Sequence, residues 1–197
     1  MNSNALLGAL CAALLVAAPS AQAITLASTS LGGNDNNGVL IGADTLGVDV
    51  GLRGFSPATF TFTKGPNSAA SYDFSSVIEN LIGFPFGSVQ VSLLGGATFA
   101  GTGSVTPGFG TIDSITLLPA VGSTSLTVAF GANGEPFGVN IGNPFGALGL
   151  ADWTIRLGNA DSFSVEFAAT PIPIPGGLVL LLSGLAGFAV MSRRRKA

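Results

Sequence analysis

The sequence predicts an all-β body, an antiparallel β-sandwich of the jelly-roll or immunoglobulin-like type, followed by a single carboxyl-terminal transmembrane helix. Three observations predict this architecture. Hydrophobic residues in the central part of the chain alternate with a period of two, and no stretch there shows a helical period. Turn-forming residues separate the alternating segments. The carboxyl end, in contrast, is a continuous apolar run followed by four basic residues.

Residues 1–23 are predicted to be a secretory signal peptide. A run of small and aliphatic residues from Ala5 to Ala18 precedes an A-x-A site formed by Ala21 and Ala23, and we expect signal peptidase to cut after Ala23. The alternative is an uncleaved anchor, which needs about 20 apolar residues, and this run is shorter. The only cysteine, Cys11, lies in this segment, so the exported chain would carry no thiol.

The expected body, residues 24–167, is acidic and rich in aromatic residues. Residues 24–170 contain ten acidic and three basic side chains, a net charge of −7, which would repel nucleic acid and anionic lipid. We therefore exclude nucleic acid as a partner. Thirteen of the fourteen phenylalanines lie in this segment, so the chain can fill a hydrophobic core.

The alternation places the strands. Clear period-two segments occur at 45–53, 59–63, 88–93, 125–130, 152–157 and 162–167. Further strands are expected at 24–29, 38–41, 71–79 and 97–100. The pattern assigns to the core Phe60, Phe62, Val89, Val91, Leu126, Val128, Trp153, Ile155, Phe163 and Val165, and to the solvent Thr59, Thr61, Gln90, Thr127, Arg156 and Glu166. Segment 111–117 changes phase between Ile112 and Ile115, which predicts a β-bulge near Asp113-Ser114.

Turn chemistry suggests how these strands are connected. Asn37-Gly38 is a strong hairpin-turn signal. Pro-Phe-Gly occurs at 85–87, 136–138 and 144–146, and each copy is predicted to be a turn that places its Phe in the core. Asp152 to Phe167 resembles a closing hairpin with its turn at 158–160.

The inventory of reactive groups is small. The chain has no histidine, which excludes His-dependent triads and ordinary zinc or copper sites. A Ser–Lys dyad would need Lys64, which lies in a turn-like segment. Carboxylate pairs for glycoside hydrolysis could be drawn only from Asp113, Glu135, Asp152, Asp161 and Glu166, and no pair stands out. We therefore expect no enzymatic activity.

A calcium site is the weak metal candidate. Asn34, Asp35 and Asn36 offer oxygen ligands, but the last position of an EF-hand loop, which carries a Glu, is occupied here by Asp44. A plain turn is the favoured interpretation, and no cofactor is expected.

The carboxyl end has three parts: a Pro-rich linker at 168–175, an apolar segment from Gly176, and a basic tail that ends the predicted membrane segment 176–197. Pro171, Pro173 and Pro175 favour extended backbone. Basic residues beside a membrane span stay in the cytoplasm, so the body would lie outside. The basic residues that stop translocation are Arg193, Arg194, Arg195 and Lys196.

This three-part tail resembles the PEP-CTERM sorting signal of Gram-negative bacteria. The motif Ile172-Pro173-Ile174-Pro175-Gly176 is similar to the Val-Pro-Leu-Pro-Ala variant, although it has Gly176 in place of Ala and lacks the Glu of the common form. The resemblance covers 27 of the 197 residues. It implies processing by an exosortase, a membrane-embedded cysteine transpeptidase that removes the helix and basic tail. The alternative is a permanent anchor with a proline-stiffened stalk.

Together these features predict a non-enzymatic structural protein of the cell surface or biofilm matrix, with an inner-membrane intermediate during export. Expected partners are signal peptidase, exosortase, the inner membrane and, from the resemblance, exopolysaccharide. One alternative is a membrane-anchored carbohydrate-binding module, for which Trp153 and Tyr72 are the candidate sugar platforms. The second alternative is a glycan-directed hydrolase.

Overall fold

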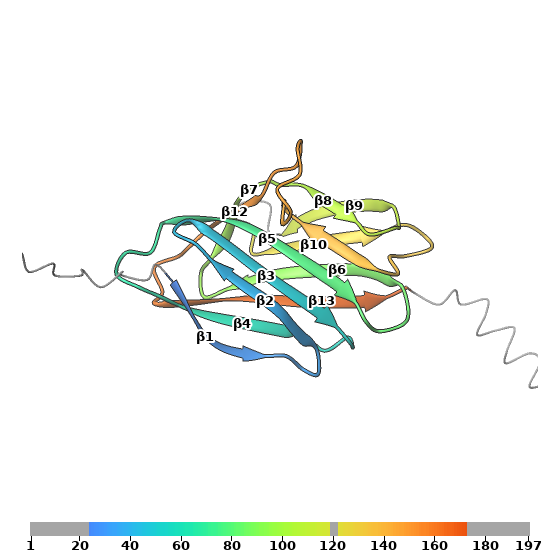
Figure 1. The fold of residues 1–197 in the computed structure, drawn as a ribbon, viewed down its shortest axis with the longest axis horizontal. Coiled ribbons are helices and arrows are strands. Elements are labelled where there is room, and N and C mark those ends of the chain that lie inside the picture. Colours follow the sequence, from blue (N-terminus) through green and yellow to red (C-terminus); the bar gives the residue numbers. More distant parts are fainter. Residues whose placement is uncertain (1–23, 119–121, 173–197) are drawn as a thin grey trace, which may run out of the picture.

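The computed structural model describes residues 24–118 and 122–172, and the regular secondary structure in these residues is entirely β-strand, as predicted (Figure 1). Sheet A contains, in spatial order, β1 (Ile24–Ser30), β4 (Ala58–Lys64), β13 (Ser162–Pro171), β6 (Phe86–Leu94), β10 (Ser125–Phe130) and β9 (Ile112–Leu118). Sheet B contains β2 (Asp35–Ile41), β3 (Thr45–Leu52), β5 (Ser71–Asn80), β11 (Gly138–Ile141) and β8 (Val105–Pro107). The strand β12 (Trp153–Arg156) pairs with the first half of β5 and with β7 (Thr98–Gly101).

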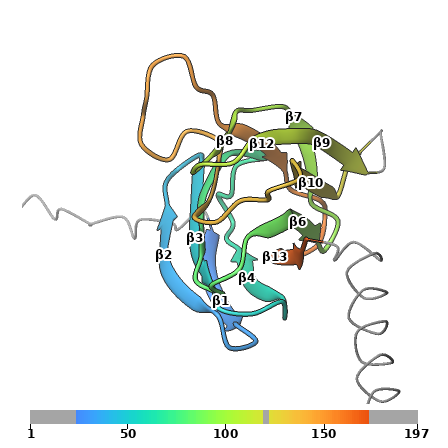
Figure 2. The ribbon, with the colours of Figure 1, turned by 90° about the vertical axis from the view of Figure 1, so that its right-hand side faces the viewer.

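The two sheets lie face to face and enclose one hydrophobic core (Figure 2). All ten residues predicted to face the core are at most 2 % exposed. The six residues predicted to face solvent are exposed or half-buried. The alternation therefore located the core correctly, because each strand buries one face only.

The predicted bulge in β9 is also confirmed. Phe130 of β10 lies opposite Ile112, whereas Ala129 lies opposite Ser114. Asp113 is therefore the extra residue, and its insertion restores the phase of the apolar side chains on either side.

One pair of strands contradicts the prediction of wholly antiparallel sheets. Strands β3 and β5 are parallel neighbours in sheet B. The chain between them crosses to sheet A as β4 and then returns, and such a crossover is what a parallel pair requires.

Two predicted hairpins are wrong for the same reason: successive strands lie in different sheets. Asn37-Gly38 is not a turn but part of β2, where the pairing with β3 shifts register between Asn36 and Gly38. The turn lies earlier, where the Asn34 amide donates to the Leu31 carbonyl at 2.9 Å, and it joins β1 of sheet A to β2 of sheet B. Similarly, β12 belongs to sheet B, while β13 lies between β4 and β6 in sheet A.

The Pro-Phe-Gly prediction of a turn with a buried Phe holds in full at none of the three copies, because the only buried Phe lies at the start of a strand and not in a turn. Phe86 begins β6 and is fully buried, but Phe137 and Phe145 are 66 % and 74 % exposed. After Phe137, Gly138 lies directly against β5 with φ 133°, and a side chain there would collide with the carbonyl oxygen of Ile78. The Phe137 ring beside this close contact is exposed to solvent.

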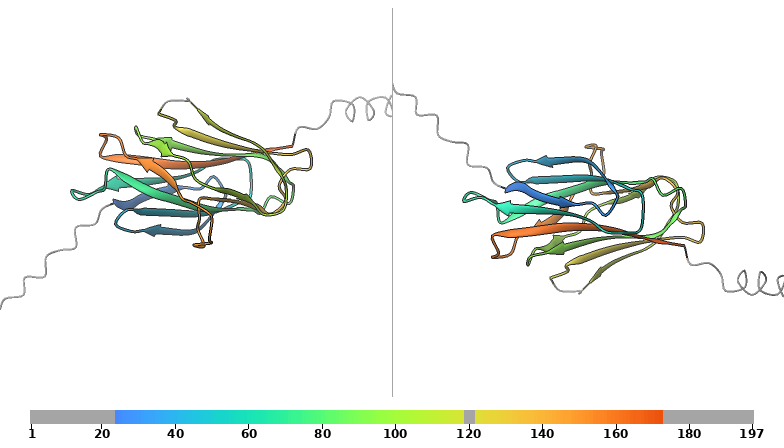
Figure 3. Two further views of the ribbon diagram at one scale, coloured as in Figure 1. Left: turned by 90° about the horizontal axis from the view of Figure 1, so that it is seen from above. Right: turned by 90° about the horizontal axis from the view of Figure 1, so that it is seen from below.

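Strand β13 continues to Pro171 and so includes the first four residues of the segment predicted as a linker. Strand β1 begins at one end of the body and β13 finishes at the other (Figure 3). The predicted signal peptide, the rest of the sorting motif from Pro173 and the predicted membrane segment 176–197 lie outside the described residues. Within residues 24–118 and 122–172, none of the structure is a helix long and apolar enough to cross a membrane.

Candidate functional site

The candidate site is the end of the body at which β13 finishes, which we call the exit end (Figure 1). It consists of Pro171 and Ile172 together with four loops, 53–57, 81–85, 108–111 and 131–137. Backbone hydrogen bonds join these loops to one another and to the strands beside them. Leu81 donates to the carbonyl of Leu52, Gly131 donates to that of Thr111, and Phe86 exchanges hydrogen bonds with Glu135 in both directions.

Ile172, the first residue of the predicted sorting motif, lies half-buried on this surface. Glycines make room for it and for Pro171. A Cβ at Gly134 would come within 2.7 Å of the Ile172 Cδ1 atom, and one at Gly87 within 2.6 Å of the Pro171 carbonyl oxygen. Because these positions carry no side chain, the end of β13 packs directly onto the neighbouring backbone.

A shallow apolar depression surrounds this point. It has a volume of about 350 Å³ and is lined by Phe55, Phe84, Pro85, Pro171 and Ile172. Ile172, which begins the motif, thus forms one wall of this apolar depression. It is also the last residue that the structure describes.

Glu135 holds two of the exit-end loops together, a role that its position beside a turn in the sequence does not indicate. Its side chain is fully buried. Its Oε2 atom accepts hydrogen bonds from the amides of Phe109 at 3.0 Å and Gly110 at 2.7 Å, and its Oε1 atom accepts from Phe137 at 2.9 Å and Gly138 at 3.3 Å. Four donors converge on one carboxylate, which is how a buried charge is kept stable.

These contacts set the ionisation of Glu135. Burial raises the pKa of the carboxyl group, but the backbone hydrogen bonds from Phe109, Phe137, Gly110 and Gly138 outweigh it, and the pKa lies below its ordinary value. Glu135 therefore stays ionised and engaged at neutral pH. A carboxylate with these partners is a structural element and not a free acid or base.

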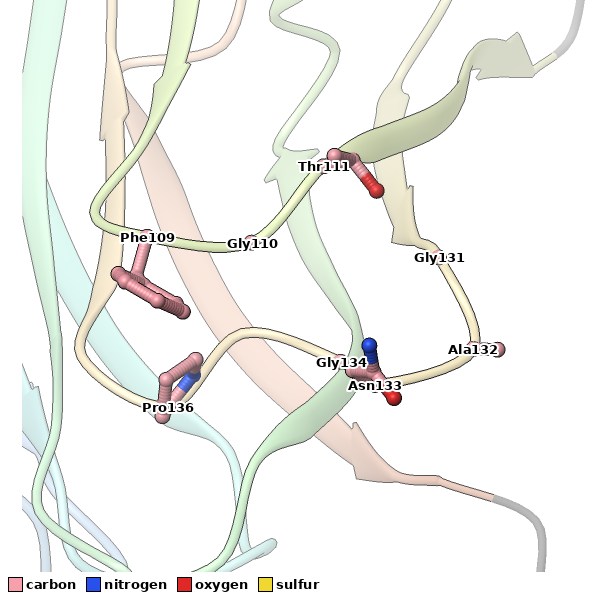
Figure 4. A pocket seen from close by; sticks show the side chains of 8 residues that line it. All are labelled: Phe109, Gly110, Thr111, Gly131, Ala132, Asn133, Gly134 and Pro136. Atoms are coloured by element: carbon pink, nitrogen blue, oxygen red, sulfur yellow. The ribbon is translucent and has the colours of Figure 1, made fainter.

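A second depression of about 280 Å³ lies beside the first, and Figure 4 shows its lining. The ring of Phe109 points toward Pro136 across it. Thr111 and Asn133 supply its polar side chains, and glycine and alanine backbone forms most of the remaining wall. Such a lining offers shape and weak hydrogen bonding, without an acid–base pair.

Four phenylalanines project from the exit end, one from each loop. Phe55 is 42 % exposed, Phe84 70 %, Phe109 77 % and Phe137 66 %. The rings of Phe109 and Phe137 form an edge-to-face pair with centroids 6.0 Å apart. Exposed apolar residues gathered in one place are typical of an interaction surface.

The weak calcium candidates have structural partners. Asn34 is buried, and its Oδ1 atom accepts from the amides of Arg53 and Gly54 while its amide group donates to Ser56. Asp35 forms an ion pair with Arg53 at 2.7 Å, and Asn36 accepts from the Gly38 amide at the bulge of β2. Within residues 24–118 and 122–172, no three His, Cys, Asp or Glu side chains are grouped so that they could hold a metal ion.

The other carboxylates considered for hydrolysis are spread over different parts of the body. Asp152 precedes β12 of sheet B and accepts from the Asn143 amide at 2.6 Å. Glu166 lies on the outer face of sheet A, where the Thr59 hydroxyl donates to it at 3.3 Å. Asp113 is exposed on the β9 bulge and Asp161 in the turn before β13. Lys64 donates to the Gly158 carbonyl at 2.6 Å.

The outer face of sheet A is dense in hydroxyl groups. The four inner strands of this sheet contain only two charged residues, Glu166 and the terminal Lys64. Cross-strand hydrogen bonds link Thr61 to Ser164 and Ser88 to Thr170, and Gln90 to Ser125. This face is therefore polar, nearly uncharged and built from short side chains.

Neither of the candidate sugar platforms is exposed. Trp153 is 2 % exposed, as its inward phase predicted, and its indole N–H donates to the Ser104 carbonyl at 2.9 Å. Tyr72 is 1 % exposed, and its hydroxyl accepts from the Ala69 amide. Both aromatic rings belong to the core of the body.

Of the predicted site residues, the structure describes Ile172 and the three calcium candidates. The cleavage-site residues Ala21 and Ala23, the motif from Pro173 to Gly176 and the basic residues 193–196 lie outside the described part. No family model, no curated protein and no solved structure matches this chain.

Proposed function

We propose that the chain is an exported structural protein of the cell surface or biofilm matrix, in which a β-sandwich body is carried on a carboxyl-terminal sorting signal. The observation that carries this proposal is the position of β13. This last strand lies inside sheet A, between β4 and β6, and ends at Pro171, immediately before the motif. The described core residues all precede the sorting motif, so cleavage near Gly176 would leave every one of them in the released body.

The proposed route begins at the amino end. Signal peptidase cuts after Ala23, so the described strand β1 (Ile24–Ser30) stays in the exported chain. The basic residues 193–196 keep the tail in the cytoplasm, and the apolar segment before them holds the chain in the inner membrane of a Gram-negative cell. Exosortase then acts at the Pro-containing motif and releases the body to the outside.

A structural role in the matrix fits the surface of the body. The hydroxyl-rich outer face of sheet A can exchange hydrogen bonds with a neutral polysaccharide without placing charges against it. The hydrolase alternative is less well supported, because Glu135 is fully engaged with backbone amides. A carbohydrate-binding module that stacks sugars on Trp153 or Tyr72 is also disfavoured, because both are buried.

The proposal is tested by replacing the motif prolines. A Pro173→Ala/Pro175→Ala variant keeps the span and the basic residues, so it should still insert into the membrane. It should not be released, and full-length protein should accumulate in the inner-membrane fraction. Pro171→Ala is the matched control, since Pro171 belongs to β13 and precedes the motif. Release of the double variant at the wild-type rate would reject processing at this motif.

A further inference from the structure

We propose that the exit end is a membrane-docking surface, and that Phe55, Phe84, Phe109 and Phe137 place their rings in the headgroup region of the bilayer. The inference rests on the proposed function, because it requires the segment from Gly176 to span that bilayer. Docking adds to the proposed function an orientation of the body on the membrane and the residues that fix this orientation.

The chain between the body and the proposed span is short. Only Pro173, Ile174 and Pro175 separate Ile172 from Gly176. Four residue steps reach at most about 14 Å, even when fully extended. The polar headgroup layer is itself about 6 Å thick on each side of the hydrocarbon core. The exit end must therefore remain close to the lipid surface for as long as the tail is attached.

The surface that this short tether brings to the lipid is apolar. The four phenylalanines come from four different loops and are 42–77 % exposed. Apolar side chains on an otherwise polar protein are the groups that bury themselves at the boundary of headgroups and acyl chains. The depression lined by Phe55 and Phe84 also includes Ile172, so the apolar surface surrounds the point at which the chain departs.

The exit end carries little exposed charge. The four loops contain two charged residues, Arg53 and Glu135. Arg53 is paired with Asp35, and Glu135 is buried with its carboxylate hydrogen-bonded. Exposed carboxylates nearby, Glu79 and Asp113, lie on strands β5 and β9 and not on the loops. Docking on neutral lipid therefore requires little desolvation of charge, whereas the acidic remainder of the body is unsuited to a membrane surface.

Glu135 gives this surface its rigidity. The amides that donate to its carboxylate include those of Phe109 and Phe137 themselves. Two of the four rings are thus positioned by one buried side chain, and Gly134 beside it contacts Ile172. Docking would hold the motif at a fixed height above the bilayer, within reach of a protease embedded in the membrane.

The test uses a single thiol as a depth probe. The chain from Ile24 to Ala197 has no cysteine, so Phe84→Cys and Asn159→Cys variants each carry one site for an environment-sensitive dye. Asn159 is exposed in the turn between β12 and β13, away from the exit end. Each labelled chain is reconstituted into phosphatidylcholine vesicles that carry nitroxide on the headgroups, and vesicle flotation checks insertion.

Quenching at position 84 several-fold stronger than at position 159 supports docking. Equal quenching at the two positions in chains that float with the vesicles overturns docking and leaves the proposed span intact. Failure of the chains to float overturns both the span and the docking that depends on it.

Two further variants assign the effect to the named rings. With the dye at position 84, Phe109→Ser/Phe137→Ser should reduce quenching, while Phe145→Ser should not. Phe145 is 74 % exposed but lies on the loop between β11 and β12, so it is the matched control. Equal effects of the two changes would contradict the assignment. A change in dye emission when unlabelled chain is added to nitroxide-free vesicles would show that a second copy covers this surface, which also overturns the proposal.

Discussion

Glu135 is the residue whose environment departs furthest from what its sequence position suggests. A carboxylate flanking a turn is ordinarily solvated, yet this one is buried and accepts four backbone hydrogen bonds. The loops 108–111 and 131–137 depend on this carboxylate, because their backbone amides donate hydrogen bonds to it. Removing the charge would leave some of these donors facing a group that cannot accept from them.

Glu135→Gln should therefore lower the free energy of unfolding by about 2–3 kcal/mol at pH 7, because an amide nitrogen replaces one acceptor oxygen. Urea denaturation followed by tryptophan fluorescence measures this difference. Asp113→Asn is the matched control, since Asp113 is exposed and no loss is expected there. An unchanged midpoint for Glu135→Gln would mean that the carboxylate contributes nothing to the exit end.

The same residue predicts a pH dependence. The pKa of Glu135 in the folded protein lies below its ordinary value of 4.5. Between those two pKa values the unfolded chain binds a proton that the folded chain does not, so stability rises with pH in that window. The stabilisation is fully present above about pH 4.5 and is lost as the pH falls through the folded-state pKa. Wild-type stability should therefore fall more steeply on acidification than that of Glu135→Gln; parallel curves would contradict this.

Val128 tests the register of the core at the level of one side chain. It is 1 % exposed, whereas its neighbour Thr127 faces outward. Val128→Asp should lower the free energy of unfolding by roughly 3–5 kcal/mol, because it buries an unpaired charge. Thr127→Asp should cost less than about 1 kcal/mol on the opposite face. Comparable losses for the two variants would show that the register is wrong.

At the scale of elements, alternation was a reliable predictor and turn chemistry was not. The strands around Val89, Val128 and Val165 were placed correctly because burial of one face imposes a period of two on the sequence. The bulge at Asp113 could be predicted for the same reason. Asn37-Gly38 misled because it lies inside β2, where the pairing with β3 shifts register between Asn36 and Gly38.

The strands β8 and β11 were missed for a different reason. They have only three and four residues, and they include Pro107 and Gly138, residue types that argue against a strand. Strand β11 pairs with β5, and β8 pairs with β11. These pairings depend on the tertiary fold and not on a local sequence pattern.

Strand β13 provides a prediction at this scale. Residues Ala168 to Pro171 pair with β6 although the sequence suggested a linker, and Ala169 is 5 % exposed. A chain that ends at Phe167 should therefore be at least about 2 kcal/mol less stable than one that ends at Ile172, because it loses these hydrogen bonds. Urea denaturation of the two truncated chains, both starting at Ile24, makes the comparison. Equal stability would place the end of the folded body at Phe167.

At the scale of the whole molecule, the chain crosses repeatedly between the two sheets, and the turn residues in the sequence do not show where it crosses. From β3 it passes to β4 in the other sheet and returns as β5, and from β12 it passes to β13 in the other sheet. A hairpin and a crossing between sheets require similar turn residues, so the sequence could predict the strands but not their partners. Long-range packing decides whether a given turn forms a hairpin within one sheet or a crossing to the other sheet.

The candidate site shows the same division. Ile172 could be singled out from the sequence because prolines and an apolar run follow it. Glu135 and the four exposed phenylalanines could not, since they come from separate loops that only the fold brings together. Pro-Phe-Gly in particular predicted a buried ring at 137, where the structure has an exposed one.

The central claim is that a complete body is released from a temporary membrane tail. The intact mass of the wild-type protein, measured separately in the secreted and inner-membrane fractions, tests it most directly. The account predicts that secreted protein begins at Ile24 and lacks everything from about Gly176 onward, while the membrane fraction contains the chain with Arg193–Lys196 still attached. Protein that retains Arg193–Lys196 in every fraction would contradict the account and identify the tail as a permanent anchor.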